Sequence, residues 1–222
     1  MPGHLQADFD RIALLPPGGF DHNAHYHRWL LRWAPRKLDE ALDLGCGTGE
    51  FARLLAARAT RVLALDFSAN MIAAARERSA GEPNIEFRQA DAMTWDWPEE
   101  RFDCVASIAT LHHLPLAPIL QRIKAALRPG GVLLVLDLRR TATFAEWLLL
   151  NLVAMPTSAL LRFIREGRVM RETRARHAWN EHAKADRYLT VEEVRRACLP
   201  ILPGAVIRRR LLWRYSLVWR KP

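Results

Sequence analysis

The chain has 222 residues, half of them hydrophobic, so it can bury a substantial core and is not a disordered segment. Its formal charge is +9, from 33 Lys and Arg against 24 Asp and Glu. Residues 138–222 hold the excess, with 18 basic and 7 acidic side chains, whereas residues 1–137 carry 15 and 17. All but four of the basic residues are arginines. Selection for positive charge alone would use lysine as well, so the excess is weak support for nucleic-acid binding.

Several protein classes are disfavoured by the composition. The three cysteines, Cys46, Cys104 and Cys198, have no close spacing, which argues against a disulfide framework or a structural zinc site. No basic stretch followed by an apolar one stands at the start, so we expect no signal peptide. The longest apolar segment, 144–164, is interrupted by polar residues and a proline, and falls short of the ~20 apolar residues of a spanning helix. We therefore expect a cytoplasmic protein without a transmembrane segment.

The first two thirds of the chain read as a helical cap followed by an alternating α/β region. Residues 23–35 have the pattern of one leading helix, within a cap of residues 1–37. Short apolar runs then alternate with amphipathic stretches over residues 38–138. The predicted strands are 41–44, 61–66, 85–89, 103–108 and 131–138, and the predicted helices are 51–59, 68–80 and 115–127. This alternation predicts a doubly wound α/β fold with a parallel sheet covered on both faces.

The last third follows a different pattern. Residues 143–177, within an insertion at 139–188, are helical in pattern, first apolar on all sides and then rich in arginine. Thr190 and Glu193 form a predicted capping box that opens a short helix. Residues 205–213 and 215–221 are predicted strands, joined tightly around Arg214. We therefore expect one domain over residues 1–222, in which 189–222 supply the last helix and a terminal hairpin.

A glycine-rich loop is the most informative motif. Gly45, Gly47 and Gly49 follow a predicted strand and open a predicted helix, where glycine permits a sharp turn and close approach of a ligand. A dinucleotide fingerprint would require glycine at position 50, but Glu50 stands there and would repel a pyrophosphate. A dinucleotide-dependent reductase is therefore disfavoured. Instead, Asp43 precedes the first glycine by two residues.

This Asp-x-Gly-x-Gly-x-Gly pattern resembles the class I S-adenosylmethionine (SAM)-dependent methyltransferases, in particular the small-molecule group that includes the ubiquinone and menaquinone C-methyltransferases. The resemblance covers residues 38–138. It implies SAM as the cofactor and a Rossmann-like, seven-stranded, mostly parallel sheet. It also implies a C-terminal antiparallel hairpin and a helical lid insertion.

The resemblance implies roles for individual residues. Asp66 would accept hydrogen bonds from the ribose hydroxyls, and the acidic motif at Asp91 would accept one from the adenine amino group. Phe67 and Met71 would flank the adenine, although these apolar side chains would also occur there if they only packed the helix against the core. The expected cofactor-binding residues are Asp43, Gly45, Cys46, Gly47, Gly49, Asp66, Phe67, Met71, Asp91, Ala92, Met93 and Ile108. Cys46 is expected to be an unreactive loop residue, because nothing near it in the sequence would lower its thiol pKa.

The sequence does not identify a catalytic residue. Methyl transfer from a sulfonium is an in-line displacement that needs no metal, and alignment alone can be worth roughly 7–11 kcal/mol. A base is required only if the acceptor must lose a proton. His113 is a candidate because it follows the fourth predicted strand. Tyr26 and His27 are candidates because the resemblance implies that the leading helix closes over the cofactor. His182 and Asp186 are expected to form a local pair at most.

The insertion should select the acceptor. Its apolar part must be buried, form a dimer contact, or lie against a hydrophobic substrate or membrane surface. We expect a small, fairly apolar acceptor. One alternative is an RNA methyltransferase that uses the arginine-rich part of the insertion, and another is a non-catalytic partner subunit with a SAM fold. Peripheral membrane contact through the apolar part and homo-oligomerisation are left open, and no metal is expected.

Overall fold

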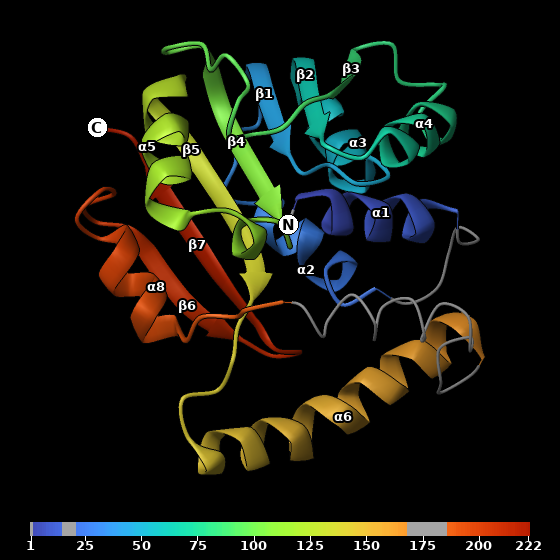
Figure 1. Ribbon diagram of the computed structural model, residues 1–222, viewed down its shortest axis with the longest axis vertical. Helices are drawn as coiled ribbons and strands as arrows, with labels where there is room; N and C mark the ends of the chain where they lie inside the picture. The colour runs from blue at the N-terminus through green and yellow to red at the C-terminus, as the bar shows by residue number, and fades with distance from the viewer. Residues whose placement is uncertain (1, 15–20, 168–185) are drawn as a thin grey trace.

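The computed structural model describes residues 2–14, 21–167 and 186–222. Its sheet has seven strands in the order β3-β2-β1-β4-β5-β7-β6 (Figure 1). The strands are β1 (Leu38–Leu44), β2 (Ala59–Asp66), β3 (Ile85–Gln89), β4 (Phe102–Ile108), β5 (Leu127–Leu138), β6 (Val206–Arg210) and β7 (Arg214–Arg220). β1 to β5 pair in parallel, and β7 runs antiparallel to both β5 and β6. The predicted sheet and terminal hairpin are confirmed.

Helices cover both faces of the sheet. They are α1 (Pro2–Ala13), α2 (Ala24–Leu31), α3 (Glu50–Ala56), α4 (Ala69–Arg78), α5 (Leu116–Ala126), α6 (Phe144–Glu166) and α8 (Val191–Cys198), with a short 3₁₀ helix η1 (Leu111–His113). Successive strand residues alternate between the two cores: Leu63 packs with α5 and α8, whereas Val62 and Ala64 pack with α2, α3 and α4. This two-residue alternation, apolar on both sides, is what a sheet buried on both faces requires.

The parallel pairing places the ends of four strands at one edge of the sheet. In the register, Leu44 of β1 lies beside both Leu65 of β2 and Ser107 of β4. The segments that follow β1, β2, β4 and β5 therefore emerge together. Ligands of open α/β sheets bind at this carboxyl edge, next to the point where the strand order reverses.

Several boundaries differ from the prediction by a few residues, and two of them affect the C-terminal half of the sheet. The hairpin turn is residues 211–213, and Arg214 lies within β7, where it pairs with Arg210. Leu212 and Trp213 have φ of 57° and 58°, a left-handed conformation that their side chains do not signal in the sequence. β5 begins at Leu127 rather than at residue 131, with an irregular register opposite β4 around Gly130. α1 lies within the predicted helical cap of residues 1–37, although the only helix expected there was at 23–35.

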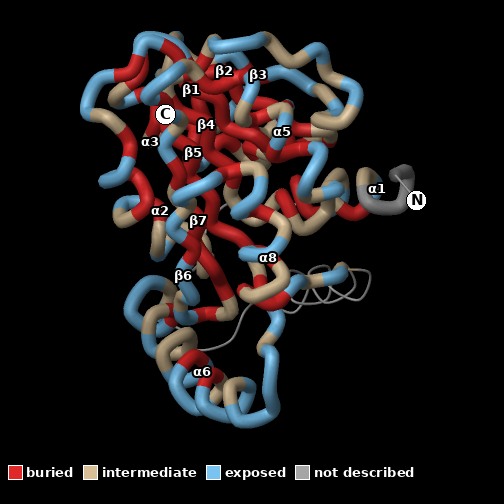
Figure 2. Tube along the Cα trace, turned by 90° about the vertical axis from the view of Figure 1, so that its left-hand side faces the viewer, coloured by how far each residue is buried: buried red, intermediate tan, exposed pale blue. Residues whose placement is uncertain are grey.

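α6 is a single helix that continues through Pro156, with Thr143 as its N-cap. The part of the predicted helix beyond Gly167 lies outside the described residues. Figure 2 shows that most of α6 is exposed, while the central strands of the sheet are buried. Ten large apolar side chains on α6 are exposed, among them Phe144, Leu149, Leu152 and Ile164. The interpretation that this segment is simply buried against the domain is therefore wrong for its described part.

By length and composition α6 is also able to cross a membrane, contrary to the expectation from its interruptions. Its most apolar window has a mean hydropathy of 1.5, and 17% of that window is buried. A single helix of this kind also occurs in proteins that do not span a membrane, so these two properties do not establish a span.

Candidate cofactor-binding site

The glycine loop connects β1 to α3 in a left-handed conformation. Gly45, Gly47 and Gly49 have φ of 73°, 51° and 77°. A Cβ on Gly45 would lie 2.1 Å from Thr110 Oγ1, in the segment after β4, so this glycine is required for space as well as for conformation. A Cβ on Gly47 would meet nothing within 4 Å. The middle of the loop therefore has open space beside its backbone, as a ligand that approaches closely requires.

Asp43 lies at the end of β1 with 1% of its surface exposed. Neither carboxylate oxygen accepts a hydrogen bond of normal geometry from a described residue. Burial, and secondarily the charge of Asp66, raise the pKa of Asp43 to about 7, with a partial offset from the backbone amide of Ala52. A buried carboxylate without a partner is costly. Its surroundings therefore fit a ligand that brings a positive charge or a hydrogen-bond donor, and SAM carries an ammonium and a sulfonium group.

Asp66 ends β2 and holds the glycine loop to the start of α4. Its Oδ2 accepts a hydrogen bond from the Gly47 amide at 2.9 Å, and its Oδ1 accepts one from the Ser68 amide at 3.0 Å. Burial raises the pKa of this carboxyl, and these amides partly oppose the shift. Each ionised carboxylate oxygen can accept a further hydrogen bond. The geometry thus leaves acceptor capacity for ligand hydroxyls.

The other predicted cofactor residues surround the same edge. Phe67 is half-buried, with its ring centroid 5.6 Å from that of Phe9 in an edge arrangement. Met71 is buried under α1, in one cluster with Ile12 and Ala13. α1 also docks through Asp10, which accepts hydrogen bonds from the Ser68 hydroxyl and the Asn70 amide. The contribution of α1 was missed, because its sequence carries no motif.

The remaining predicted cofactor residues lie after β1, β3 and β4. Asp91 is exposed, and its Oδ1 accepts a hydrogen bond from the Met93 amide at 2.8 Å. Ala92 and Met93 pack at the border of the core that contains α5, and Ile108 packs at the border of the opposite core. Cys46 is buried, and burial raises the pKa of its thiol well above the ordinary value. Such a thiol is a poor nucleophile.

Two of the candidate catalytic residues are poorly suited to accept a proton. The Tyr26 hydroxyl donates to the Leu211 carbonyl at 3.0 Å, and burial raises its pKa. His27 is buried, with Nδ1 3.9 Å from a carboxylate oxygen of Glu50 at the start of α3. Burial lowers the pKa of His27 to about 4, so the ring is neutral at pH 7 but weakly basic.

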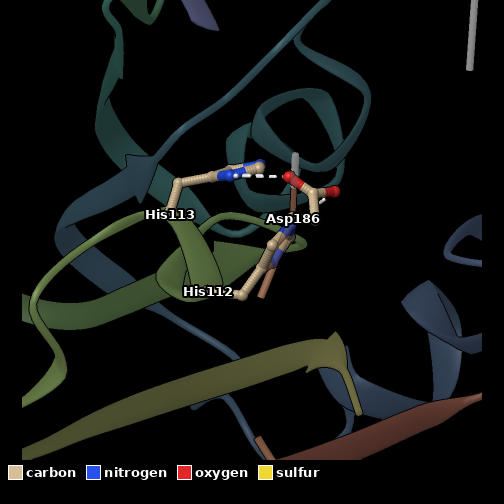
Figure 3. A group of neighbouring side chains, drawn as sticks. All are labelled: His112, His113 and Asp186. Atoms are coloured by element: carbon tan, nitrogen blue, oxygen red, sulfur yellow. Dashed lines mark ion pairs between the residues drawn. The ribbon is translucent and has the colours of Figure 1, made fainter. Parts of the chain in front are cut away.

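His113 belongs to a cluster that sequence reasoning did not find (Figure 3). His112 and His113 come from η1, after β4, and Asp186 precedes α8. His113 Nδ1 lies 3.4 Å from Asp186 Oδ1, and His112 Nε2 lies 3.8 Å from Asp186 Oδ2. Asp186 is thus next to these two histidines, and its expected partner His182 lies outside the described residues. Only the fold brings the three side chains together.

The sheet order and the glycine loop at its carboxyl edge define a Rossmann-like methyltransferase fold. Residues 41–131 match a family described as a methyltransferase domain. An uncharacterized methyltransferase of Mycobacterium tuberculosis is 34% identical over 205 residues, which is 90% of this chain and 96% of that protein. The chain therefore belongs to the class I SAM-dependent methyltransferases and is an enzyme of that family.

Further similar proteins agree with this assignment. A 2-phytyl-1,4-naphtoquinone methyltransferase of Thermosynechococcus vestitus is 37% identical over 170 residues, covering 70% of this chain and 75% of that protein. The solved structure of N-methyltransferase NodS from Bradyrhizobium japonicum, in complex with S-adenosyl-L-homocysteine, has a TM-score of 0.61 at 17% identity. It covers 98% of both chains. At this identity the structural likeness establishes the fold alone.

Proposed function

We propose that this chain binds SAM between the glycine loop, the end of β2 and the segment after β3. In this proposal the twelve cofactor residues predicted from the sequence line that site. The buried carboxylate of Asp43, to which no described residue donates a hydrogen bond of normal geometry, at the strand end that leads into the open glycine loop, is the observation that carries the proposal. When bound, SAM supplies a methyl group on a sulfonium, which is already electrophilic. The residues of the chain then need only bind and align the two reactants.

In this proposal Asp66 accepts the ribose hydroxyls while it keeps its bonds to Gly47 and Ser68. Of the three candidate bases, His113 is the best placed to accept a proton from the acceptor. Its ring centroid lies 5.5 Å from that of Phe9, which also contacts Phe67. The ring therefore lies close to the residues expected to flank the adenine, whereas the Tyr26 hydroxyl donates to Leu211 and burial makes His27 weakly basic.

Calorimetric titration with SAM tests the cofactor site. A hydrogen bond to a charged group contributes about 1.5–3 kcal/mol net, so Asp66→Ala should weaken SAM binding at least about tenfold. Asp96→Ala, on an exposed residue beyond the site, is the matched control and should bind normally. Asp66→Asn retains the size of the side chain and separates loss of binding from loss of folding. Equal SAM affinity in all four proteins would refute the site.

We further propose that the acceptor is a small, fairly apolar molecule, for which the naphthoquinone methyltransferase among the relatives gives a chemical example. The exposed apolar surface of α6 supports this class of acceptor. Transfer of labelled methyl from SAM should be tested with a reduced naphthoquinone that carries an apolar chain, with trans-aconitate, and with RNA. We expect label in the apolar product. Label in RNA would support the RNA alternative, and no label with any acceptor would favour a non-catalytic subunit.

The same surface supports peripheral contact with an anionic membrane. α6 exposes ten large apolar side chains, and the last third of the chain carries most of the excess positive charge. An exposed apolar helix on a protein with net positive charge suits the interface of a negatively charged bilayer. Such contact would bring the enzyme to acceptors dissolved in the membrane.

A further inference from the structure

Three potential metal ligands converge at the carboxyl edge of the sheet, next to the candidate cofactor site (Figure 3). They are His112 and His113, directly after β4, and Asp186, before α8. One atom from each lies within 4.8 Å of the other two. We propose that these residues bind a divalent transition-metal ion such as Zn²⁺.

The distances are close to those of a coordination shell. Ligand atoms bound to zinc at about 2.1 Å lie about 3.4 Å apart when the geometry is tetrahedral. His113 Nδ1 and Asp186 Oδ1 are 3.4 Å apart, and His112 Nε2 and Asp186 Oδ2 are 3.8 Å apart. The three side chains therefore need only small movements to reach a common ion. All three are largely buried, with at most 10% of each side chain exposed.

The partner of His112 on its other side determines which nitrogen faces the cluster. His112 Nδ1 is 2.6 Å from Asp137 Oδ1, and the His112 amide donates to Asp137 Oδ2 at 2.9 Å. Asp137 is fully buried in β5. A carboxylate at this distance accepts a hydrogen bond from Nδ1, so Nε2 is the nitrogen that faces Asp186 and is placed to coordinate an ion.

This arrangement is the one that metal-binding histidines commonly have. Their second nitrogen donates to a carboxylate, which fixes the tautomer and the orientation of the ring. Asp186 is oriented as well, because the Tyr188 hydroxyl donates to its Oδ2 at 2.6 Å. Two histidines and one carboxylate form a ligand set that suits zinc and other first-row transition metals.

Three protein ligands leave coordination positions for an oxygen of another molecule. A metal ion lowers the pKa of a hydroxyl bound to it. If the proposed function holds, a bound ion would replace His113, which would then be a ligand, as the group that promotes loss of the acceptor's proton, and the acceptor class is narrowed to molecules with a phenolic or enolic hydroxyl. The proton of that hydroxyl would pass to water, and the oxygen would remain bound to the ion. Metal binding itself does not depend on this second step.

The test uses the full-length, tag-free protein after treatment with a chelator. Calorimetric titration with ZnCl₂ should show one ion per chain, and titration with Co²⁺ should give a saturable visible absorption band. Asp186→Asn and His113→Asn should each weaken metal binding at least tenfold. Asp137→Asn should weaken it about 10- to 100-fold, because it removes the partner that orients His112. The exposed His25→Asn is the matched control and should bind like the wild type.

Titration of each variant with SAM reports whether the fold is intact and keeps the two proposals separate. Loss of metal binding with normal SAM binding is the expected result for Asp186→Asn. Metal binding that is absent from the wild type, or equal in wild type and Asp186→Asn, would overturn the metal site. Absent SAM binding with normal metal binding would overturn the proposed cofactor site and leave the metal site standing.

Discussion

Gly45 and Gly47 share a left-handed backbone but differ in what surrounds them. Gly45 faces the side chain of Thr110, whereas Gly47 faces open space. One glycine is therefore needed to fold the loop against the segment after β4, and the other is placed where a ligand would approach. The sequence shows both as the same motif, and only the structure separates the two roles.

Alanine substitutions at these two positions should differ in their main effect: Gly45→Ala should mainly lower stability, and Gly47→Ala should mainly weaken SAM binding. Gly45→Ala should lower the free energy of unfolding by about 1–3 kcal/mol through overpacking, besides the strain of the left-handed conformation. Gly47→Ala adds only that strain, about 1–2 kcal/mol, but places a methyl group in the open space and should weaken SAM binding more than stability. Urea unfolding and SAM calorimetry on both variants measure the two effects.

The truncation Thr110→Ala in the Gly45→Ala background supplies the control. It removes the atoms nearest to the new methyl group and should recover part of the lost stability. No recovery would show that the hydroxyl and methyl groups of Thr110 do not account for the effect at Gly45.

At the level of elements, α6 exposes more large apolar side chains than any other helix that the structure describes. Only Leu150, Ala154 and Arg162 on it are buried, and Leu150 and Ala154 pack against Leu212 in the hairpin turn. Arg162 is 3.1 Å from Glu166 in the same helix. α6 is thus anchored along one narrow line, and most of its apolar surface faces outward.

Vesicle sedimentation tests the function of that surface. We expect the wild type to bind vesicles rich in phosphatidylglycerol and to bind weakly to neutral phosphatidylcholine. Leu149→Glu combined with Leu152→Glu should abolish binding, because both side chains are more than 60% exposed and a charge disfavours insertion. The matched control is Val206→Glu, an exposed apolar residue of β6. Equal binding by wild type and the double variant would contradict the proposal.

An element can be predicted from the sequence when neighbouring residues in the chain determine it, and not when residues distant in the chain do. The capping box was predicted correctly: the Thr190 hydroxyl accepts from the Glu193 amide, and the Glu193 carboxylate accepts from the Thr190 amide. The hairpin turn was misplaced because Leu212 and Trp213 adopt positive φ without glycine. The cluster around Asp186 was missed because its members are distant in the chain and no spacing rule connects them.

At the scale of the whole molecule, many arginines of the basic last third serve the fold. Arg139 pairs with Glu146 at 2.7 Å, and its Nε donates to the Arg214 carbonyl. Arg214 is buried and donates to the Asn23 side chain, while the Arg210 guanidinium lies 3.8 Å from the centroid of Trp29. These contacts join the insertion, the hairpin and α2. Arg168, Arg171 and Arg174 lie outside the described residues, so the structure does not test their expected role.

The stability of the ligand-free protein should depend on pH through Asp43. Its pKa is raised from 3.8 to about 7, so the folded state holds a proton that the unfolded state has lost between these values. Stability from this group is complete below pH 4 and is lost as the pH rises to about 7. His27, with its pKa lowered to about 4, acts in the opposite direction below pH 6.5. The comparison must therefore isolate Asp43.

Asp43→Asn provides that comparison, because His27 is present in both proteins. The stability of the wild type relative to Asp43→Asn should fall between pH 5 and pH 8, by about 1.4 kcal/mol for each unit of pKa shift that this interval covers. Urea unfolding at several pH values measures the difference. A difference that is constant with pH would contradict the raised pKa.

The anchoring of α6 on Leu212 also has a consequence for synthesis of the chain. The turn that receives Leu150 and Ala154 is translated well after the helix itself. Chains begin to fold from the N-terminus while they are being made. α6 therefore leaves the ribosome before this turn exists, when only its N-terminal contacts, such as that of Ser158 with His22, are available among those described. During that interval chaperones or a lipid surface can cover its apolar side chains.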